Sequence, residues 1–329
     1  MKELVIISGK GGTGKTSVAA SFAVLAVRPV IADCDVDAAD LHLVLSPQIK
    51  ERHDFHAGHK AVIRSQDCIG CGACLANCRF GAVVQDDDAD GLATSGSKFD
   101  CINCDYCARS CSIRNRALIR EMQEAMGLTK PTIFRIDPFA CEGCRVCVQF
   151  CPVKAIDFPE CLCGEWMVSE TRCGPMVHAR LGIAAENSGK LVSLVRNHAR
   201  KIAEEQDRSI IIIDGPPGIG CPVIASVTGC SQVLIVTEPT VSGEHDLKRI
   251  VSLTRHFSIP AAVCVNKWDL NPEMTQRIED NARQLGTQIV GRIRYDRAIT
   301  DAQMQARAVV ETEASSAADI REIWDQLDL

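Results

Sequence analysis

The chain lacks the features of membrane, secreted and polyanion-binding proteins. Its 329 residues carry a formal net charge of -6, so no general electrostatic attraction to nucleic acid or anionic lipid exists. No apolar run is long enough to cross a bilayer, and the first residues contain neither the basic nor the apolar segment of a signal peptide. Solenoid repeats are also missing. We therefore expect a cytoplasmic protein that neither inserts into a membrane nor binds nucleic acid.

Cysteine, in contrast, is abundant. Twelve of the 19 cysteines form three runs with the spacing Cys-x2-Cys-x2-Cys-x3-Cys: Cys68, Cys71, Cys74 and Cys78; Cys101, Cys104, Cys107 and Cys111; and Cys141, Cys144, Cys147 and Cys151. Equal spacing suits thiolates that converge on a metal better than it suits a disulfide framework. Bacterial ferredoxins use this spacing, and their fourth cysteine ligates the neighbouring cluster. The pattern predicts two [4Fe–4S] clusters, with zinc or structural thiols as the alternative.

The three runs are not equivalent. A proline follows the last cysteine only in the third run, at Cys151-Pro152. Spacing alone leaves the pairing of the runs open, because the first and second runs are the closest in sequence. A third cluster on the middle run is a further hypothesis, with its fourth ligand supplied by Cys111 or by one of Cys161, Cys163 and Cys173.

A nucleotide-binding loop opens the chain, between the apolar segment Leu4–Ile7 and a helical pattern. Glycines leave room for backbone N–H groups to point at a polyphosphate. In the predicted site, Lys15 contacts the β- and γ-phosphates and the Thr16 hydroxyl coordinates Mg²⁺. The residues expected to bind the nucleotide are Gly11, Gly12, Thr13, Gly14, Lys15, Thr16 and Ser17.

The order of apolar segments predicts one α/β domain that the cysteine-rich region interrupts. Strands are expected at Val30–Ala32, Ile210–Asp214, Gln232–Thr237, Ala261–Asn266 and Ile289–Ile293, with helical stretches between them. We predict a mostly parallel sheet of the P-loop NTPase type, formed by residues 1–55 and 174–329. Residues 56–173 would then be an inserted, small α+β ferredoxin-like domain. The polar segment with His53, His56 and His59 is expected to be a loop that leads into it.

Several motifs of the sheet domain resemble those of the deviant Walker A ATPases, the MinD/ParA and nitrogenase iron-protein superfamily. The matching segments are Gly9–Thr16 with its additional Lys10, Asp33–Ala38, Asp214–Gly218 and Asn266–Asp269. The whole chain resembles the subgroup of MinD-superfamily ATPases with an inserted ferredoxin domain, although members of that subgroup usually carry two cysteine runs. The resemblance implies an ATPase that acts as a homodimer.

The same resemblance implies roles for individual residues. Lys10 would contact phosphate across the dimer, Asp35 would orient the attacking water, and Asp214 would assist Mg²⁺. Asn266 and Lys267 would recognise the adenine base. For the clusters, the resemblance pairs the first and third runs, with Cys68, Cys71, Cys74 and Cys151 on one cluster and Cys141, Cys144, Cys147 and Cys78 on the other.

The leading functional hypothesis is an ATP-gated electron carrier that passes electrons from its clusters to a redox partner protein. The alternative is an ATP-dependent scaffold that delivers a metallocluster to an accepting protein. A corrinoid-type amidotransferase synthase ranks last, because the chain has no glutaminase nucleophile motif.

Overall fold

The chain folds into two compact units. The computed structural model describes residues 1–86, 133–182 and 187–327. One unit comprises Met1–Phe55 and Cys163–Leu329, and the other comprises His56–Leu162. We call them the sheet unit and the cysteine unit. The middle cysteine run, Cys101–Cys111, lies outside the described residues, so a third cluster remains a prediction.

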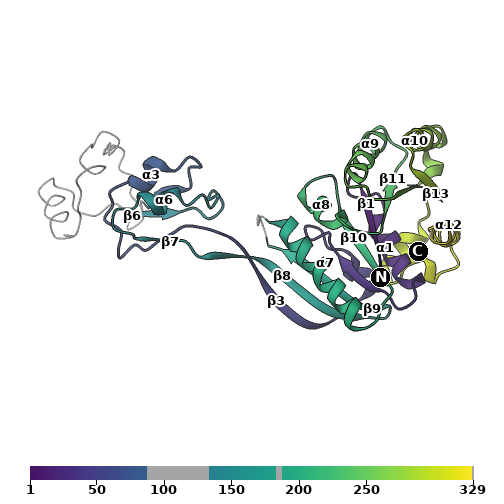
Figure 1. The fold of residues 1–329 in the computed structure, drawn as a ribbon, viewed down its shortest axis with the longest axis horizontal. Coiled ribbons are helices and arrows are strands. Elements are labelled where there is room, and N and C mark those ends of the chain that lie inside the picture. The colour runs from purple at the N-terminus through teal and green to yellow at the C-terminus, as the bar shows by residue number, and fades with distance from the viewer. Residues whose placement is uncertain (87–132, 183–186, 328–329) are drawn as a thin grey trace, which may run out of the picture. The chain divides into compact units, whose positions relative to one another are not determined.

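A nine-stranded sheet with the order β13-β12-β11-β1-β10-β2-β9-β8-β3 is the framework of the sheet unit (Figure 1). Its strands are β1 (Lys2–Ser8), β2 (Val30–Asp33), β3 (Gln48–His59), β8 (Glu160–Thr171), β9 (Gly174–Leu181), β10 (Ile210–Pro217), β11 (Gln232–Thr237), β12 (Ala261–Asn266) and β13 (Gln288–Ile293). From β13 to β9 every neighbouring pair is parallel, whereas β8 is antiparallel to β9. The prediction of a mostly parallel α/β sheet is confirmed.

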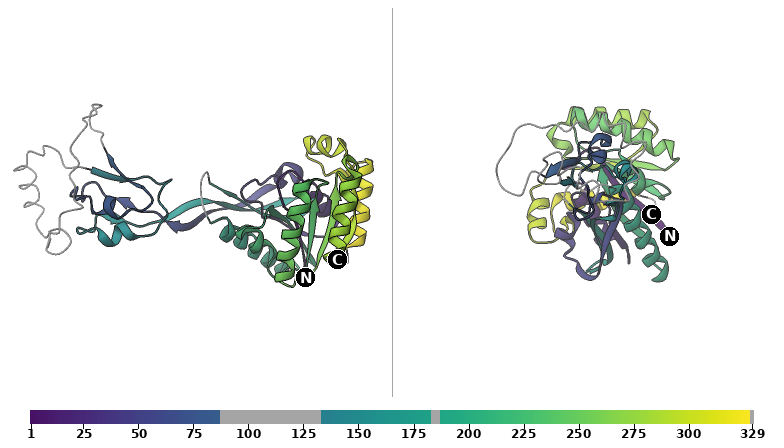
Figure 2. Two further views of the ribbon diagram at one scale, coloured as in Figure 1. Left: turned by 90° about the horizontal axis from the view of Figure 1, so that it is seen from above. Right: turned by 90° about the vertical axis from the view of Figure 1, so that its left-hand side faces the viewer.

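Helices lie on both faces of this sheet (Figures 1 and 2). They are α1 (Lys15–Leu25), α2 (Leu41–Leu45), α7 (Ser188–Glu205), α8 (Cys221–Val227), α9 (Val241–His256), α10 (Pro272–Gln284), α11 (Ala298–Met304) and α12 (Ser315–Gln326). Alternate β1 residues Leu4 and Ile6 pack with Val18 and Phe22 of α1 in one core cluster. The central strands therefore consist of nearly continuous aliphatic runs, because both of their faces are covered.

Strand β3 replaces the expected loop around His53 and His56. Its first seven residues are all exposed and only Phe55 and Ala57 are buried, so most of the segment has no apolar periodicity from which a strand could be predicted. Its neighbour β8 belongs to the same sheet and pairs with β9 as far as Thr171 and Gly174. For this reason the compact cysteine unit ends at Leu162, before the boundary expected at residue 173.

The cysteine unit contains two small antiparallel sheets and two short helices. Strand β4 (Val62–Ile63) pairs with β7 (Ile156–Asp157), and β5 (Val83–Asp86) pairs with β6 (Ile133–Ile136). Helix α3 (Ala73–Asn77) contacts α6 (Val146–Phe150). The buried core of the described part of this unit comprises Ala61, Cys74, Val83, Phe134 and Ile156. Among the described helices of the whole chain, none has the length and apolarity needed to span a bilayer.

Candidate functional site

The glycine loop connects β1 directly to α1. Gly12 and Gly14 have left-handed backbone angles, with φ of 79° and 89°. A Cβ atom at Gly14 would lie 2.2 Å from Nδ2 of Asn266, so both the conformation and the space require glycine there. Asn266 Nδ2 donates to the carbonyl oxygen of Thr13 at 2.7 Å, which fixes the end of β12 to the loop.

Lys15 lies among three acidic side chains that the parallel strands bring together. Its Nζ atom is 2.6 Å from Oδ1 of Asp214 and 3.2 Å from Oδ2 of Asp35, and Asp33 is also buried nearby. Burial opposes the charge of Lys15, but Asp214 and Asp35 outweigh it and raise the pKa of Lys15. Burial raises the pKa of Asp33 well above its ordinary value, and Asp214 adds to that shift. The single ammonium group of Lys15 therefore lies among three carboxyl groups, those of Asp33, Asp35 and Asp214.

The donor set of this region fits a Mg²⁺-bound polyphosphate. Three buried oxygens, Thr13 Oγ1, Asp33 Oδ2 and Asp214 Oδ2, have no hydrogen-bond partner among the described residues. Carboxylate and hydroxyl oxygens are the ligands that Mg²⁺ prefers. The Thr16 hydroxyl belongs to the same group, because its oxygen lies 3.5 Å from Nζ of Lys15.

A further acidic residue, Glu238, joins this site. Its two carboxylate oxygens pair with Lys10 at 3.2 Å and with Lys267 at 2.6 Å, and Lys267 also donates to the carbonyl oxygen of Gly12 at 3.2 Å. Burial opposes the charge of Glu238, but hydrogen bonds and charges from Lys267 and Lys10 lower its pKa. Sequence reasoning assigned no role to Glu238, and its position directly after β11 was the available signal.

The other two predicted loop residues differ in their surroundings. Gly11 is exposed, and no heavy atom lies within 4 Å of a Cβ built there. Ser17 Oγ accepts a hydrogen bond from Nε2 of Gln303, a residue of α11, at 2.9 Å.

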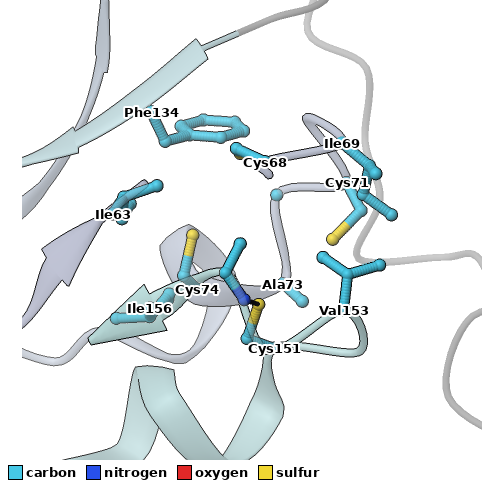
Figure 3. Close-up of a pocket in the computed structure, with 12 residues that line it drawn as sticks. Ile63, Cys68, Ile69, Cys71, Ala73, Cys74, Phe134, Cys151, Val153 and Ile156 are labelled. Carbon is cyan, nitrogen blue, oxygen red and sulfur yellow. Dashed lines mark hydrogen bonds between the residues drawn. The ribbon is translucent and has the colours of Figure 1, made fainter. Parts of the chain in front are cut away.

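One pocket in the described part of the cysteine unit lies between residues of the first and third cysteine runs. Four cysteines from two runs line it: Cys68, Cys71, Cys74 and Cys151 (Figure 3). The remaining lining is apolar and includes Ile63, Phe134, Val153 and Ile156. The backbone N–H of Ala155 donates to Sγ of Cys151 at 3.2 Å, and that of Gly70 donates to Sγ of Cys68 at 3.5 Å.

A second pocket in the described part of this unit has the reciprocal composition. Its cysteines are Cys78, Cys141, Cys144 and Cys147. Each pocket thus combines three cysteines of one run with the fourth cysteine of the other. Among the described residues, no group of three His, Cys, Asp or Glu side chains is gathered closely enough to hold a single metal ion. The thiols of each pocket instead surround a cavity.

Of the remaining cysteines, Cys34, Cys230 and Cys264 are buried, as expected for small core residues. Cys221, the first residue of α8, is exposed.

Two histidine environments were not anticipated from the sequence. Trp166 stacks on His53, with ring centroids 4.2 Å apart, and contacts the tilted ring of His198 in α7, with centroids 4.1 Å apart. The buried His178 lies 2.8 Å from Oγ of Ser169, and burial lowers its pKa to about 4.

Comparisons with known proteins agree with this fold. The chain is 29% identical over 274 residues to an uncharacterized protein of Methanocaldococcus jannaschii, covering 82% of this chain and 79% of that protein. Its fold is similar to the septum site-determining protein MinD of Pyrococcus horikoshii in complex with Mg-ADP, with a TM-score of 0.51, 14% identity, and coverage of 99% and 96%. A ParA family ATPase from Chlorobium tepidum gives a TM-score of 0.50 at 14% identity, with coverage of 100% and 99%.

A family model extends over almost the whole chain. It describes the CobQ/CobB/MinD/ParA nucleotide binding domain and matches residues 4–309, which include the glycine loop, the three aspartates and Asn266. This chain belongs to the CobQ/CobB/MinD/ParA family of nucleotide-binding domains.

Proposed function

We propose that this protein is a homodimeric ATPase that couples its nucleotide state to electron transfer through two [4Fe–4S] clusters to a partner protein. The observation that carries the proposal is the reciprocal make-up of the two cysteine pockets. Exchange of the fourth cysteine between two runs is the ligand arrangement of bacterial two-cluster ferredoxins. The same chain contains a nucleotide-binding domain of an ATPase family.

The sheet unit would bind and hydrolyse MgATP. The loop amides and Lys15 would bind the phosphates, while Thr16 and Asp214 would hold Mg²⁺. Asp35 lies 3.2 Å from Nζ of Lys15, within the same group of charges, and would orient the attacking water. Lys10 would contact the nucleotide of the second protomer, after exchanging its ion pair with Glu238 for a phosphate. Asn266 and Lys267 lie against the loop and would form the adenine side of the site.

The cysteine unit would hold the two clusters. Four thiols around each cavity match a group in which every iron atom takes one thiolate, and soft sulfur ligands favour iron–sulfur clusters. The inserted unit would then be a ferredoxin-like domain. When bound, such clusters store and release single electrons.

A series of contacts in the sheet unit supports control by the nucleotide. The segment after β10 is bound to the loop region, because the Gly218 N–H donates to the Ser8 carbonyl oxygen at 2.8 Å. It continues into α8, whose C-terminal carbonyl groups at Ala225 and Thr228 accept from Nη1 of Arg196 in α7, at 3.2 and 2.6 Å. Helix α7 also packs His198 on Trp166 of β8. A γ-phosphate that shifts residues 218–220 would thus move the helix that contacts β8, the strand through which the chain leaves the cysteine unit.

The alternative function is delivery of a cluster as cargo to an accepting protein. Cys144 is exposed, and an exposed ligand is accessible to an incoming thiolate. Carriers release the intact cluster to an apo-acceptor in the presence of ATP, whereas electron carriers keep it and change only its oxidation state.

The experiment uses the full chain, prepared and reconstituted without oxygen. Two clusters give about eight iron and eight sulfide per chain, and twelve of each would require the third cluster. Cys151→Ser should lose the iron of one site, whereas Cys264→Ala, at a buried cysteine of the sheet unit, should keep all of it. MgATP should change the midpoint potential or the accessibility of the iron to a chelator. A preparation without acid-labile sulfide, or one whose clusters do not respond to MgATP, would contradict the proposal.

A further inference from the structure

The two cysteine pockets are built on matching turns that differ in one residue. Helix α3 follows Gly72, which has φ 70° and ψ 2°, and helix α6 follows Arg145, which has φ 65° and ψ 3°. Both residues lie between the second and third cysteines of their run. The backbone is therefore the same in both places, while the side chain differs.

This left-handed conformation favours glycine and is unfavourable for a residue that carries a Cβ atom. A non-glycine residue in such a conformation is a reason to look for a functional constraint. The Arg145 side chain has a defined place, because its Cζ atom lies 5.7 Å from the ring centroid of Phe158. Both Arg145 and Phe158 line the second pocket. The arginine is exposed, but its guanidinium is held at the wall of the cavity.

The two pockets consequently differ in polarity. The residues that line the first pocket include no charged side chain, and its Cys74 is buried. The second pocket is lined by two charged residues, Arg145 and Glu142, and its Cys144 is exposed. A pair of cluster sites with the same ligands therefore has two different electrostatic environments.

We propose that the positive charge of Arg145 raises the reduction potential of one cluster above that of the other. The affected cluster is the one held by Cys78, Cys141, Cys144 and Cys147. This inference rests on the proposed function. Reduction adds one electron from an external low-potential reductant and one negative charge, and no bond forms or breaks. A fixed cation and better solvation both stabilise the more negative state, whereas Glu142 opposes it. The second site thus accepts the electron first.

The test is an anaerobic redox titration of the full-length, reconstituted protein, followed by the spectroscopic signals of the reduced clusters, with dithionite as the reductant. Arg145→Gly gives the second run the residue of the first. It should lower the reduction potential of one cluster by up to about 59 mV and leave the potential of the other cluster unchanged. For a one-electron couple, about 59 mV corresponds to a tenfold change in the equilibrium distribution of the electron between the two clusters. Arg145→Lys keeps the positive charge and should leave the reduction potential of this cluster close to that of the unsubstituted protein. Glu142→Gln removes a negative charge and should raise the same potential.

The reciprocal variant, Gly72→Arg, should raise the other potential, and Arg145→Gln tests the loss of charge without introducing glycine. Iron and sulfide analysis of each preparation separates the two proposals. Absence of clusters in the unsubstituted protein overturns the proposed function. Two clusters whose potentials ignore both Arg145→Gly and Arg145→Gln overturn the inference alone. Unchanged potentials with slower reduction of an acidic partner would show that Arg145 is a docking residue instead.

Discussion

The sheet unit and the cysteine unit are stabilised in different ways. In the sheet unit, aliphatic strands such as Ile210–Ile213 are covered by helices on both sides, and the burial of apolar surface is extensive. The cysteine unit has only two-stranded sheets and a small buried cluster in its described part. Five cysteines of the two described runs are packed against that cluster as partly buried residues. The difference predicts that the sheet unit folds by hydrophobic burial, whereas the described part of the cysteine unit would gain stability from a bound metal group that links its cysteines.

The largest expected effect follows from this difference. Removal of iron by a chelator should unfold the cysteine unit, because small metal-binding domains gain most of their folding free energy from the metal. The sheet unit should keep its thermal transition. Calorimetry and circular dichroism of the chelated and reconstituted protein would measure both transitions. An unchanged transition of the cysteine unit after iron loss would contradict the comparison.

A substitution in the nucleotide site should affect the sheet unit and leave the cysteine unit folded. Lys15→Met should abolish measurable nucleotide binding, a loss of at least about 100-fold, because it removes the cation that contacts phosphate. It should also lower the free energy of unfolding of the sheet unit by about 3–5 kcal/mol, since Asp35 and Asp214 lose their buried partner. Titration of MgATP and thermal unfolding give the two values.

The exposed Lys201, which pairs with Glu205 at 3.8 Å, supplies the control for that variant. Lys201→Met should change neither nucleotide binding nor stability beyond about 0.5 kcal/mol. The iron content should be equal in both variants. Iron loss in Lys15→Met would show that the two units do not fold independently.

Hydrolysis can be separated from binding at Asp35. Asp35→Asn should lower the hydrolysis rate by about 10²–10⁴-fold and leave MgATP binding within about tenfold, because the amide keeps the shape but replaces one of the carboxylate oxygens that would orient the attacking water. Steady-state phosphate release and equilibrium binding measure the two effects. A variant that hydrolyses ATP at the normal rate would remove Asp35 from the reaction.

The smallest effect is a pH dependence of the sheet unit. Burial lowers the pKa of His178 from 6.5 to about 4, so between these values the unfolded chain binds a proton that the folded chain does not. The contribution of His178 to stability should therefore fall by about 2–3 kcal/mol as the pH decreases from about 6.5 to 4. His178→Gln should reduce this slope in urea titrations. His245→Gln, at a 68% exposed side chain, should not.

Local sequence patterns predicted the central sheet well. The runs Ile210–Asp214 and Gln232–Thr237 are apolar because both faces of these strands are buried, so composition alone indicates them. The ends of the same strands carry Asp214 and Glu238, but the sequence does not show that Glu238 binds Lys10 and Lys267. Such ion pairs join residues that are far apart in the chain, and they depend on the order of strands in the sheet.

The edge of the sheet was predicted less well. Strand β3 is mostly polar and exposed and buries only Phe55 and Ala57, so pairing in the sheet holds most of its length. The ring contacts of Trp166 with His53 and His198 depend on three separate elements, and no local pattern encodes them. The grouping of Cys151 with the first run and of Cys78 with the third was implied by the family resemblance, whereas the left-handed conformation of Arg145 could not be anticipated.

The sheet unit is assembled from two separated stretches of sequence, and this has a consequence for biosynthesis. The glycine loop leaves the ribosome long before Asp214, and β1 cannot obtain its neighbours β10 and β11 until the insert has been translated. All eight cysteines of the first and third runs therefore emerge before the ATP site can be completed. Iron loading of a nascent chain would then precede the first opportunity to bind nucleotide.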